Sequence, residues 1–291
     1  MIFSKQKYVA INITTSLLLL LFAYAPVSAQ LVRDSVEELS RIDIVERLGE
    51  NIPLNLKFTN QNGQAVTLGD YFKKDKPVIL VLAYYECPML CNLVLNGLGQ
   101  GIKDLSWTPG EKYEIITVSI DPLETAELAF SKRANYLKSI NRPDLEKGWD
   151  FLVGDDSQSK ALTEAVGFKY YYIEDKDEYA HPAAIYILSD EGKISRYLYG
   201  IEFKAKNLKL GLLEAAQGKI GSSMDRIILY CFRYNPDEKG YVLIASNVMK
   251  LAGAITLILL STLVGVLWYR EKRKVKVKVD NIKQNLPIVK E

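Results

Sequence analysis

Two cysteines and the only histidine of the chain are the residues whose chemistry stands out. Cys87 and Cys91 are four positions apart, where an apolar run ends and a helical pattern begins. A helix N-terminus stabilises negative charge, which lowers the pKa of a thiol and makes it a better nucleophile and metal ligand. Residues four apart on a helix point to the same side. We therefore expect the two sulfurs to converge on one site.

The spacing of the cysteines leaves two interpretations open. A local disulfide or thiol redox site is one of them, although a thioredoxin-type motif has two residues between its cysteines and this chain has three. A metal site is the other, provided that His181 joins the pair and is not merely a structural histidine. Two thiolates and one imidazole suit Cu(I), whereas zinc usually takes a fourth ligand. We predict copper as the metal, chiefly as Cu(I), with Cu(II) left open.

An alternating α/β pattern should position these residues. The apolar run 77–85 predicts a strand buried on both faces, and 88–103 predicts the helix that carries Cys91. The polar stretch 174–179 before His181 is expected to be a loop that brings the ligand to the cysteines or withdraws it. The remaining patterns predict strands at 113–120 and 149–153, helices at 124–140 and 157–166, and hairpins of 54–59 with 65–68 and of 182–188 with 194–199. This order predicts a thioredoxin-like three-layer α/β domain.

Charge is distributed unevenly along the chain. Of the 37 basic residues, two lie in the first 29 positions and eight in 270–291, while only three of the 35 acidic residues lie in these ends, so 30–269 carries a net charge of −5. Binding to nucleic acid needs clustered cations. The acidic middle therefore argues against nucleic acid as a partner.

The N-terminal segment 1–29 has the pattern of a secretory signal peptide. Two lysines precede an apolar run, and the small residues Val27, Ser28 and Ala29 precede the expected cleavage site. An uncleaved anchor is the alternative. Both interpretations place the middle of the chain outside the cytoplasm.

A second apolar segment, 243–269, is predicted to be a transmembrane helix. Its last 19 residues carry no charge, and Trp268 and Tyr269 stand at its end. The basic segment 270–291 is expected to stay in the cytoplasm. Between the two apolar segments we predict a linking or helical segment at 30–50, the domain at 51–220 and a juxtamembrane helix at 221–242. The protein should thus cross the cell membrane once, with its domain on the periplasmic side.

Several motifs taken together resemble the Sco/SenC family of copper-binding assembly proteins for cytochrome c oxidase. The resemblance covers roughly residues 50–203 and depends on the order of the motifs more than on any one of them. The motifs are Tyr85–Cys91, Val118–Pro122 followed by Thr125, Phe151–Asp155, and His181 ahead of Ala184–Leu188 with Asp190 and Gly192.

The resemblance implies a thioredoxin fold and copper ligands at Cys87, Cys91 and His181. It also implies that Asp121 shapes the metal site or contacts a partner, although a simple turn or helix cap explains this aspartate equally well. Two departures concern partner specificity: Asn92 replaces a frequent proline, and Leu123-Glu124 replaces a more charged run. The C-terminal position of the anchor also differs from that of many members.

From these observations we expect a membrane-anchored copper chaperone that delivers copper to the copper-site subunit of cytochrome c oxidase. In this role the Cys87–Cys91 pair should alternate between a metal-loaded dithiol and an empty disulfide. The main alternative is a thiol-disulfide oxidoreductase that reduces the cysteines of the oxidase copper site, with Cys87 as the attacking thiolate and Cys91 as the resolving thiol. A peroxidase of the same fold is a third class, although the Cys87 motif contains no arginine. Cys231 is expected to pack in an amphipathic helix, with an intermolecular disulfide as the alternative, and the tyrosines near the site are assigned to packing.

Overall fold

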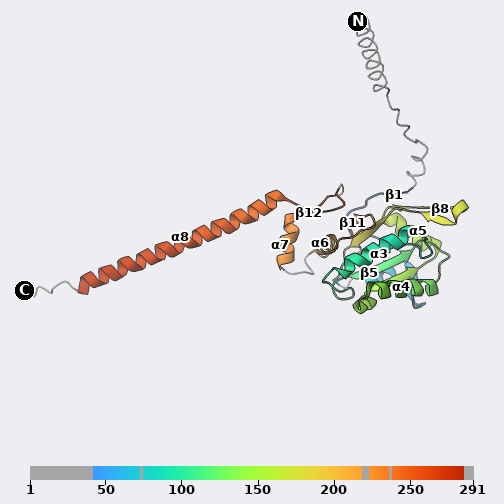
Figure 1. Cartoon of the computed structure of the whole chain (residues 1–291), viewed down its shortest axis with the longest axis horizontal. Coiled ribbons are helices and arrows are strands. Elements are labelled where there is room, and N and C mark those ends of the chain that lie inside the picture. The colour runs from blue at the N-terminus through green and yellow to red at the C-terminus, as the bar shows by residue number, and fades with distance from the viewer. Residues whose placement is uncertain (1–41, 73–74, 218–222, 236–237, 285–291) are drawn as a thin grey trace, which may run out of the picture. The chain divides into compact units, whose positions relative to one another are not determined.

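A seven-stranded mixed sheet forms the centre of the domain (Figure 1). The computed structural model describes residues 42–72, 75–217, 223–235 and 238–284. The predicted signal peptide at 1–29, and residues 30–41 of the predicted linking segment, lie outside these ranges. The strand order is β11-β10-β4-β5-β6-β2-β3. It combines β4 (Val78–Ala83), β5 (Glu114–Ser119), β6 (Trp149–Val153), β2 (Lys57–Asn60), β3 (Ala65–Thr67), β10 (Ala184–Leu188) and β11 (Ile194–Tyr199).

The three strands β4, β5 and β6 run parallel at the centre of the sheet. Every residue of β4 and β5 is buried, as predicted for both strands, although β5 includes the polar residues Glu114, Thr117 and Ser119. The strand β10 pairs antiparallel with β4, so Tyr186 lies opposite Leu80. The hairpins β2–β3 and β10–β11 form the two edges of the sheet, both as predicted.

Helices pack on this sheet and on one another. Helix α3 (Leu90–Lys103) contacts both α4 (Ala126–Ile140) and α6 (Ala205–Ala215), while α5 (Asp156–Ala165) contacts the short strand β7 (Phe168–Lys169). Close packing against α3 requires glycine at Gly97, because a Cβ there would meet the carbonyl oxygen of Ile201 at 1.9 Å. The order and packing of these elements confirm the thioredoxin-like α/β fold.

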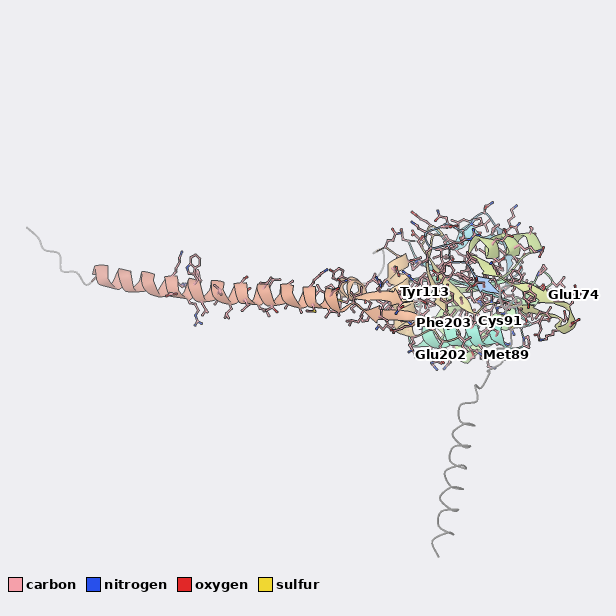
Figure 2. All side chains as sticks on the ribbon, turned by 90° about the horizontal axis from the view of Figure 1, so that it is seen from above. Met89, Cys91, Tyr113, Glu174, Glu202 and Phe203 are labelled. Atoms are coloured by element: carbon pink, nitrogen blue, oxygen red, sulfur yellow. The ribbon has the colours of Figure 1, made fainter. Side chains whose placement is uncertain are left out.

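The polar stretch 174–179, predicted to be a loop, is the tight turn of a hairpin and the start of its second strand. Strands β8 (Tyr171–Ile173) and β9 (Glu178–Ala180) form an antiparallel hairpin around a short 3-10 turn, η4 (Glu174–Lys176). Asp177 adopts the left-handed conformation, with φ of 53°, that a tight reversal needs. In Figure 2, Glu174 of this turn lies at the edge of the domain, while Cys91 lies among its side chains.

The segment before the domain is not a free linker where the structure describes it. Strand β1 (Asp43–Ile44) pairs with β7, and Gly49 donates a hydrogen bond to the carbonyl of Ile194 at 2.8 Å. Because these residues bond to the sheet region, the domain begins before residue 51.

The predicted juxtamembrane helix 221–242 is only half correct. Helix α7 (Ser223–Cys231) is followed by a hairpin of β12 (Phe232–Asn235) and β13 (Gly240–Leu243). The aromatic residues Phe232 and Tyr234 alternate with polar residues, which is the period of a strand, and Pro236 in the sequence cannot continue a helix. Tyr234 and Tyr241 pair across the hairpin and are buried in the domain core.

Helix α8 (Ala245–Gln284) contains the predicted membrane segment. Its part Ala245–Arg273 is long and apolar enough to cross a membrane, and none of its most apolar stretch is buried by protein. The helix begins two residues later than predicted and continues into the basic tail.

Candidate metal centre

The end of β4 places both cysteines. After Ala83, the chain stays buried through Tyr84 and Tyr85, and the amide of Cys87 donates to the carbonyl of Tyr84 at 3.4 Å, which turns the chain. Helix α3 then begins at Leu90, two residues later than the sequence pattern predicts, so Cys91 lies in its first turn. Cys87 therefore precedes the helix and Cys91 belongs to it.

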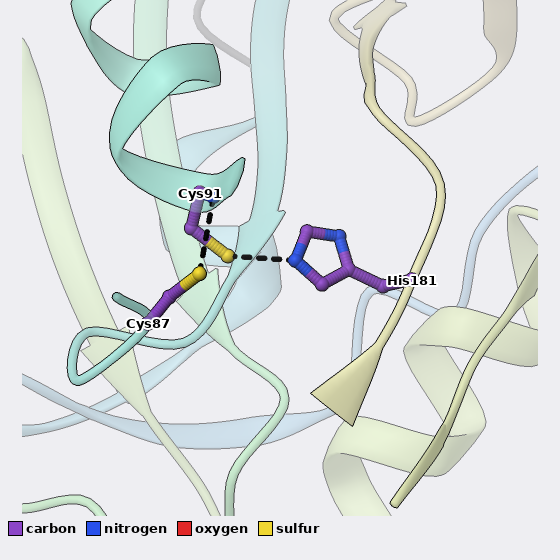
Figure 3. Close-up of side chains that lie close together, drawn as sticks. All are labelled: Cys87, Cys91 and His181. Atoms are coloured by element: carbon purple, nitrogen blue, oxygen red, sulfur yellow. Dashed lines mark hydrogen bonds between the residues drawn. The ribbon is translucent and has the colours of Figure 1, made fainter. Parts of the chain in front are cut away.

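The three predicted ligands meet at one point (Figure 3). The Cys91 amide donates to the Cys87 sulfur at 3.2 Å, and the Cys91 sulfur lies 3.0 Å from Nε2 of His181. All three ligand atoms lie within 4.8 Å of one another, and the residues are only 4%, 1% and 6% exposed in chain order. A single soft ion can contact all three atoms after small side-chain rotations.

The ring of His181 is held with Nε2 toward the cysteines. It follows β9 directly, and its ring packs against Tyr84 and Phe168 at centroid distances of 5.9 and 6.0 Å. Its Nδ1 lies 3.0 Å from the carbonyl oxygen of Pro182. A carbonyl only accepts, so Nδ1 carries the hydrogen of this bond, and Nε2 is the ring nitrogen that faces the cysteines.

The two thiols differ strongly in acidity. Hydrogen bonds from the Cys91 side chain, from His181 and from the amides of Cys91 and Met89 outweigh the effect of burial and lower the pKa of Cys87 to about 3. Burial raises the pKa of Cys91 well above its usual value, and the neighbouring Cys87 thiolate raises it further. The pair thus holds one negative charge and one proton shared between the sulfurs.

Tyr84 contributes to this site beyond the packing role expected for the tyrosines. Its amide donates to the Cys91 sulfur at 3.4 Å, and its side chain is hydrogen-bonded to Cys87. Its ring also packs edge-on against Tyr179 of β9 at 5.4 Å. Tyr84 therefore joins the cysteine loop to the hairpin that precedes His181. The sequence contained no signal that separated this tyrosine from its neighbours.

Asn92, which stands where many family members have proline, braces the cysteine loop. Its Nδ2 donates to the carbonyl of Cys87 at 2.8 Å, while its Oδ1 accepts from Lys132 at 3.2 Å and from the hydroxyl of Tyr136 at 2.9 Å. These hydrogen bonds join the cysteine loop to α4.

Asp121 does not touch the three predicted ligands through any described contact. Its Oδ1 accepts from the amide of Leu123 at 2.9 Å, as in a simple turn. It also lines a surface cavity of about 840 Å³ together with Tyr84, Glu86 and Tyr179. A contact with a partner there stays a prediction.

Glu124 takes the supporting position that the sequence suggested for Asp121. One carboxylate oxygen accepts from the amides of Tyr85 and Glu86 at 2.5 and 2.8 Å, and the other accepts from the hydroxyl of Ser119 at 2.5 Å. Burial raises the pKa of Glu124 to about 7 in spite of these three donors. The carboxylate therefore holds the backbone immediately before Cys87.

The raised pKa of Glu124 predicts a pH-dependent stability. The folded chain binds this proton more tightly than the unfolded chain, so the free energy of unfolding should fall as pH rises from about 4.5 to about 7. In Glu124→Gln this fall should be absent. Across that range, the free energy of unfolding of the variant should therefore increase by on the order of 2 kcal/mol relative to that of wild type. Urea unfolding of the full chain in detergent measures the difference.

Glu127 supplies the control of opposite sign. It is exposed, and hydrogen bonds from its own amide and from the Thr125 side chain lower its pKa. The difference in the free energy of unfolding between Glu127→Gln and wild type should therefore change with pH in the opposite direction. If Glu124→Gln and wild type keep a constant difference between pH 4.5 and 7, Glu124 does not carry the proton assigned to it.

Cys231 lies away from the cluster, at the end of α7, and is partly exposed. Its carbonyl accepts from the amide of Ile244 at 2.7 Å. It is not among the grouped ligand residues of the described chain. This position agrees with the predicted packing role in a helix and adds no ligand to the site.

A buried Cys-Cys-His cluster at the strand-to-helix junction of a thioredoxin-like domain defines a class of metal-binding or thiol-redox protein. The sequence profile described as SCO1/SenC matches residues 46–209, which is more than half of the chain. The chain belongs to the SCO1/SenC family.

Several solved structures are similar to part of this chain. A protein from Aquifex aeolicus VF5 is 26% identical, with 58% of this chain and 94% of that chain covered and a TM-score of 0.52. Copper-bound ScoI from Arabidopsis thaliana is 21% identical, with 56% and 96% covered and a TM-score of 0.43. Copper-bound ScoI from Bradyrhizobium japonicum is 23% identical, with 59% and 98% covered and a TM-score of 0.36. A search of curated protein sequences found no match.

Proposed function

We propose that the chain is a membrane-tethered copper chaperone that holds Cu(I) through Cys87, Cys91 and His181. The observation that carries this proposal is the convergence of two sulfurs and the Nε2 atom of His181 in a buried site. Soft thiolate ligands select Cu(I) over harder ions, and three donors complete its coordination without water. Family membership supports the same assignment.

The chemistry of loading follows from the protonation of the site. Cys87 offers a thiolate, and Nδ1 of His181 is engaged with the carbonyl of Pro182, so Nε2 is the ring nitrogen that would bind the ion. Cys91 must release its proton when its sulfur binds the ion. The released proton and the burial of the ligands make copper uptake dependent on pH and on access to the site.

Release would use the same two sulfurs. Ligand exchange with a partner's thiolates can transfer the ion without changing its charge. Oxidation of the empty pair forms a Cys87–Cys91 disulfide, delivers two electrons to an external thiol oxidant and removes the remaining thiol proton. A disulfide has no thiolate to bind Cu(I), so the redox state of the pair would control loading.

The cellular setting belongs to this proposal. Helix α8 would anchor the chain in the cell membrane, with the domain on the periplasmic side and the basic tail in the cytoplasm. The receiving partner would be the copper-site subunit of cytochrome c oxidase, as the family resemblance implies. Nucleic acid is not an expected partner, because the middle of the chain is acidic.

Copper transfer tests the proposal directly. The copper-loaded full chain in detergent micelles is mixed with the purified, reduced copper-binding domain of the oxidase subunit, and the two proteins are separated and assayed for copper. Copper should move to the oxidase domain. Retention of all copper by the donor would contradict a role in delivery.

A thiol-disulfide oxidoreductase remains the second candidate, because the low pKa of Cys87 also suits an attacking thiolate. The same mixture separates the two functions if the oxidase domain is supplied with its cysteines oxidised. Reduction of that disulfide by the copper-free chain, without any copper transfer from the loaded chain, would favour the reductase.

A further inference from the structure

Helix α7 carries apolar side chains on the side that faces solvent. Met224, Ile227 and Ile228 are 63%, 47% and 39% exposed, and their spacing of three and four residues places them on one face. A surface helix of a soluble domain normally presents polar residues there. This face, which we call the α7 stripe, therefore needs a partner.

The opposite side of α7 is already attached to the domain. Asp225 forms an ion pair with Lys209 of α6 at 2.6 Å, and Leu229 packs against the domain core. The hairpin after α7 adds to this attachment, because the hydroxyl of Tyr241 donates to Glu214 of α6 at 2.5 Å. The α7 stripe thus lies on the side of α7 opposite to its contacts with the domain.

The end of α7 is hydrogen-bonded to the beginning of α8. The amide of Ile244 donates to the carbonyl of Cys231 at 2.7 Å, and Nδ2 of Asn247 donates to the carbonyl of Tyr230 at 2.8 Å. Lys250 is the last charged residue before the uncharged stretch of α8. Figure 1 shows α7 beside the start of α8.

This connection fixes the depth of α7 relative to the apolar stretch. Residues 244 and 247 precede Lys250 by three to six positions, which is about 5–9 Å at the rise of a helix. The headgroup layer on each side of a bilayer is about 5–8 Å thick. The end of α7 therefore falls within the headgroup layer when α8 spans the membrane.

We infer that α7 is an interfacial helix, which lays the α7 stripe on the lipid surface beside the membrane-spanning helix. Exposed apolar residues on a short amphipathic helix bind at the boundary between headgroups and acyl chains, and an aromatic residue such as Tyr230 prefers this layer. Because α7 is bonded to α6, this contact would restrain how the copper-binding domain is oriented on the membrane. The inference rests on the membrane anchor of the proposed function.

Spin-label accessibility in the full chain tests this inference. Cys87, Cys91 and Cys231 are replaced by serine, and single cysteines are introduced by Ile227→Cys, Ile228→Cys, Phe130→Cys or Leu260→Cys. Each labelled chain is reconstituted into phosphatidylcholine vesicles that contain phosphatidylglycerol. Relaxation by oxygen reports contact with lipid, and relaxation by a water-soluble nickel complex reports contact with water. Thermal unfolding identifies any variant that has lost its fold.

Labels at 227 and 228 should be relaxed by oxygen and should show several-fold less relaxation by the nickel complex than the label at 130. Phe130 is the matched control, because it is an exposed apolar residue on α4. Nickel access at 227 and 228 equal to that at 130 would overturn the inference, and so would shielding from both reagents, which would indicate a protein partner. The label at 260 tests the anchor separately, since water access there would contradict the membrane-spanning helix itself.

Discussion

Replacing Cys91 by serine should reduce Cu(I) binding of the reduced chain from one ion to none that survives dialysis. The Cys91 sulfur is the central atom of the cluster, because it touches His181 at 3.0 Å and accepts from the Tyr84 amide at 3.4 Å. A hydroxyl keeps the shape and can still hydrogen-bond, but it is a hard donor that Cu(I) binds poorly. Copper is measured by atomic absorption after anaerobic loading and dialysis.

Cys231→Ser provides the matched control for this experiment. It removes the same chemical group from a partly exposed position at the end of α7, outside the cluster. This variant should bind copper as wild type does. If Cys91→Ser retained its copper while Cys231→Ser lost it, the metal would lie at a different place from the one assigned.

Replacing His181 by alanine should weaken Cu(I) binding by about 100-fold or more. Loss of a residue that only hydrogen-bonds to a metal ligand already costs about 10–100-fold, and His181 is expected to be a ligand itself. Its ring is buried and packs against Tyr84 and Phe168. Competition with a Cu(I) chelator of known affinity measures the change.

The same variant distinguishes the copper chaperone from the oxidoreductase. In a purely dithiol mechanism His181 is dispensable. If the chain is an oxidoreductase, the Cys87–Cys91 pair of His181→Ala should therefore still cycle between dithiol and disulfide. His181→Asn keeps a polar side chain of similar reach and controls for loss of packing. Unchanged copper affinity in both variants would remove His181 from the site and favour the redox function.

The sequence predicted the parts of this site that depend on local pattern. The apolar run before Cys87 identified a buried central strand, and the helical stripe after it placed Cys91 in the first turn of α3. These signals are strong because a fully buried strand and an amphipathic helix leave different periods in the residues themselves. The hairpin β10–β11 was readable for the same reason.

The convergence of His181 with the cysteines depends on a pairing that no local pattern contains. Strand β10 lies beside β4, which brings residue 181 to the end of β4 across about a hundred residues of sequence. The order of motifs shared with a family supplied this information. The local geometry of the polar stretch before His181 was missed, because a short hairpin rich in charged residues has the composition of a loop.

Side chains that support the site were the hardest to predict. Glu124 and Asn92 were visible only as departures from a family pattern, and their roles appear when the carboxylate meets the Tyr85 and Glu86 amides and the carboxamide meets the Cys87 carbonyl. The hairpin after α7 was missed because strands of four residues each are too short for their alternation to outweigh a helical interpretation. Its buried pair Tyr234 and Tyr241 shows that tertiary packing decided between the two.

X-ray absorption spectroscopy of the copper-loaded full chain tests the central claim most directly, because it counts the donor atoms around the ion. The account predicts Cu(I) bound by two sulfur atoms and one imidazole nitrogen, with the nitrogen contribution absent in His181→Ala. A spectrum of wild type with sulfur donors alone, unchanged by the His181 substitution, would contradict the three-residue centre.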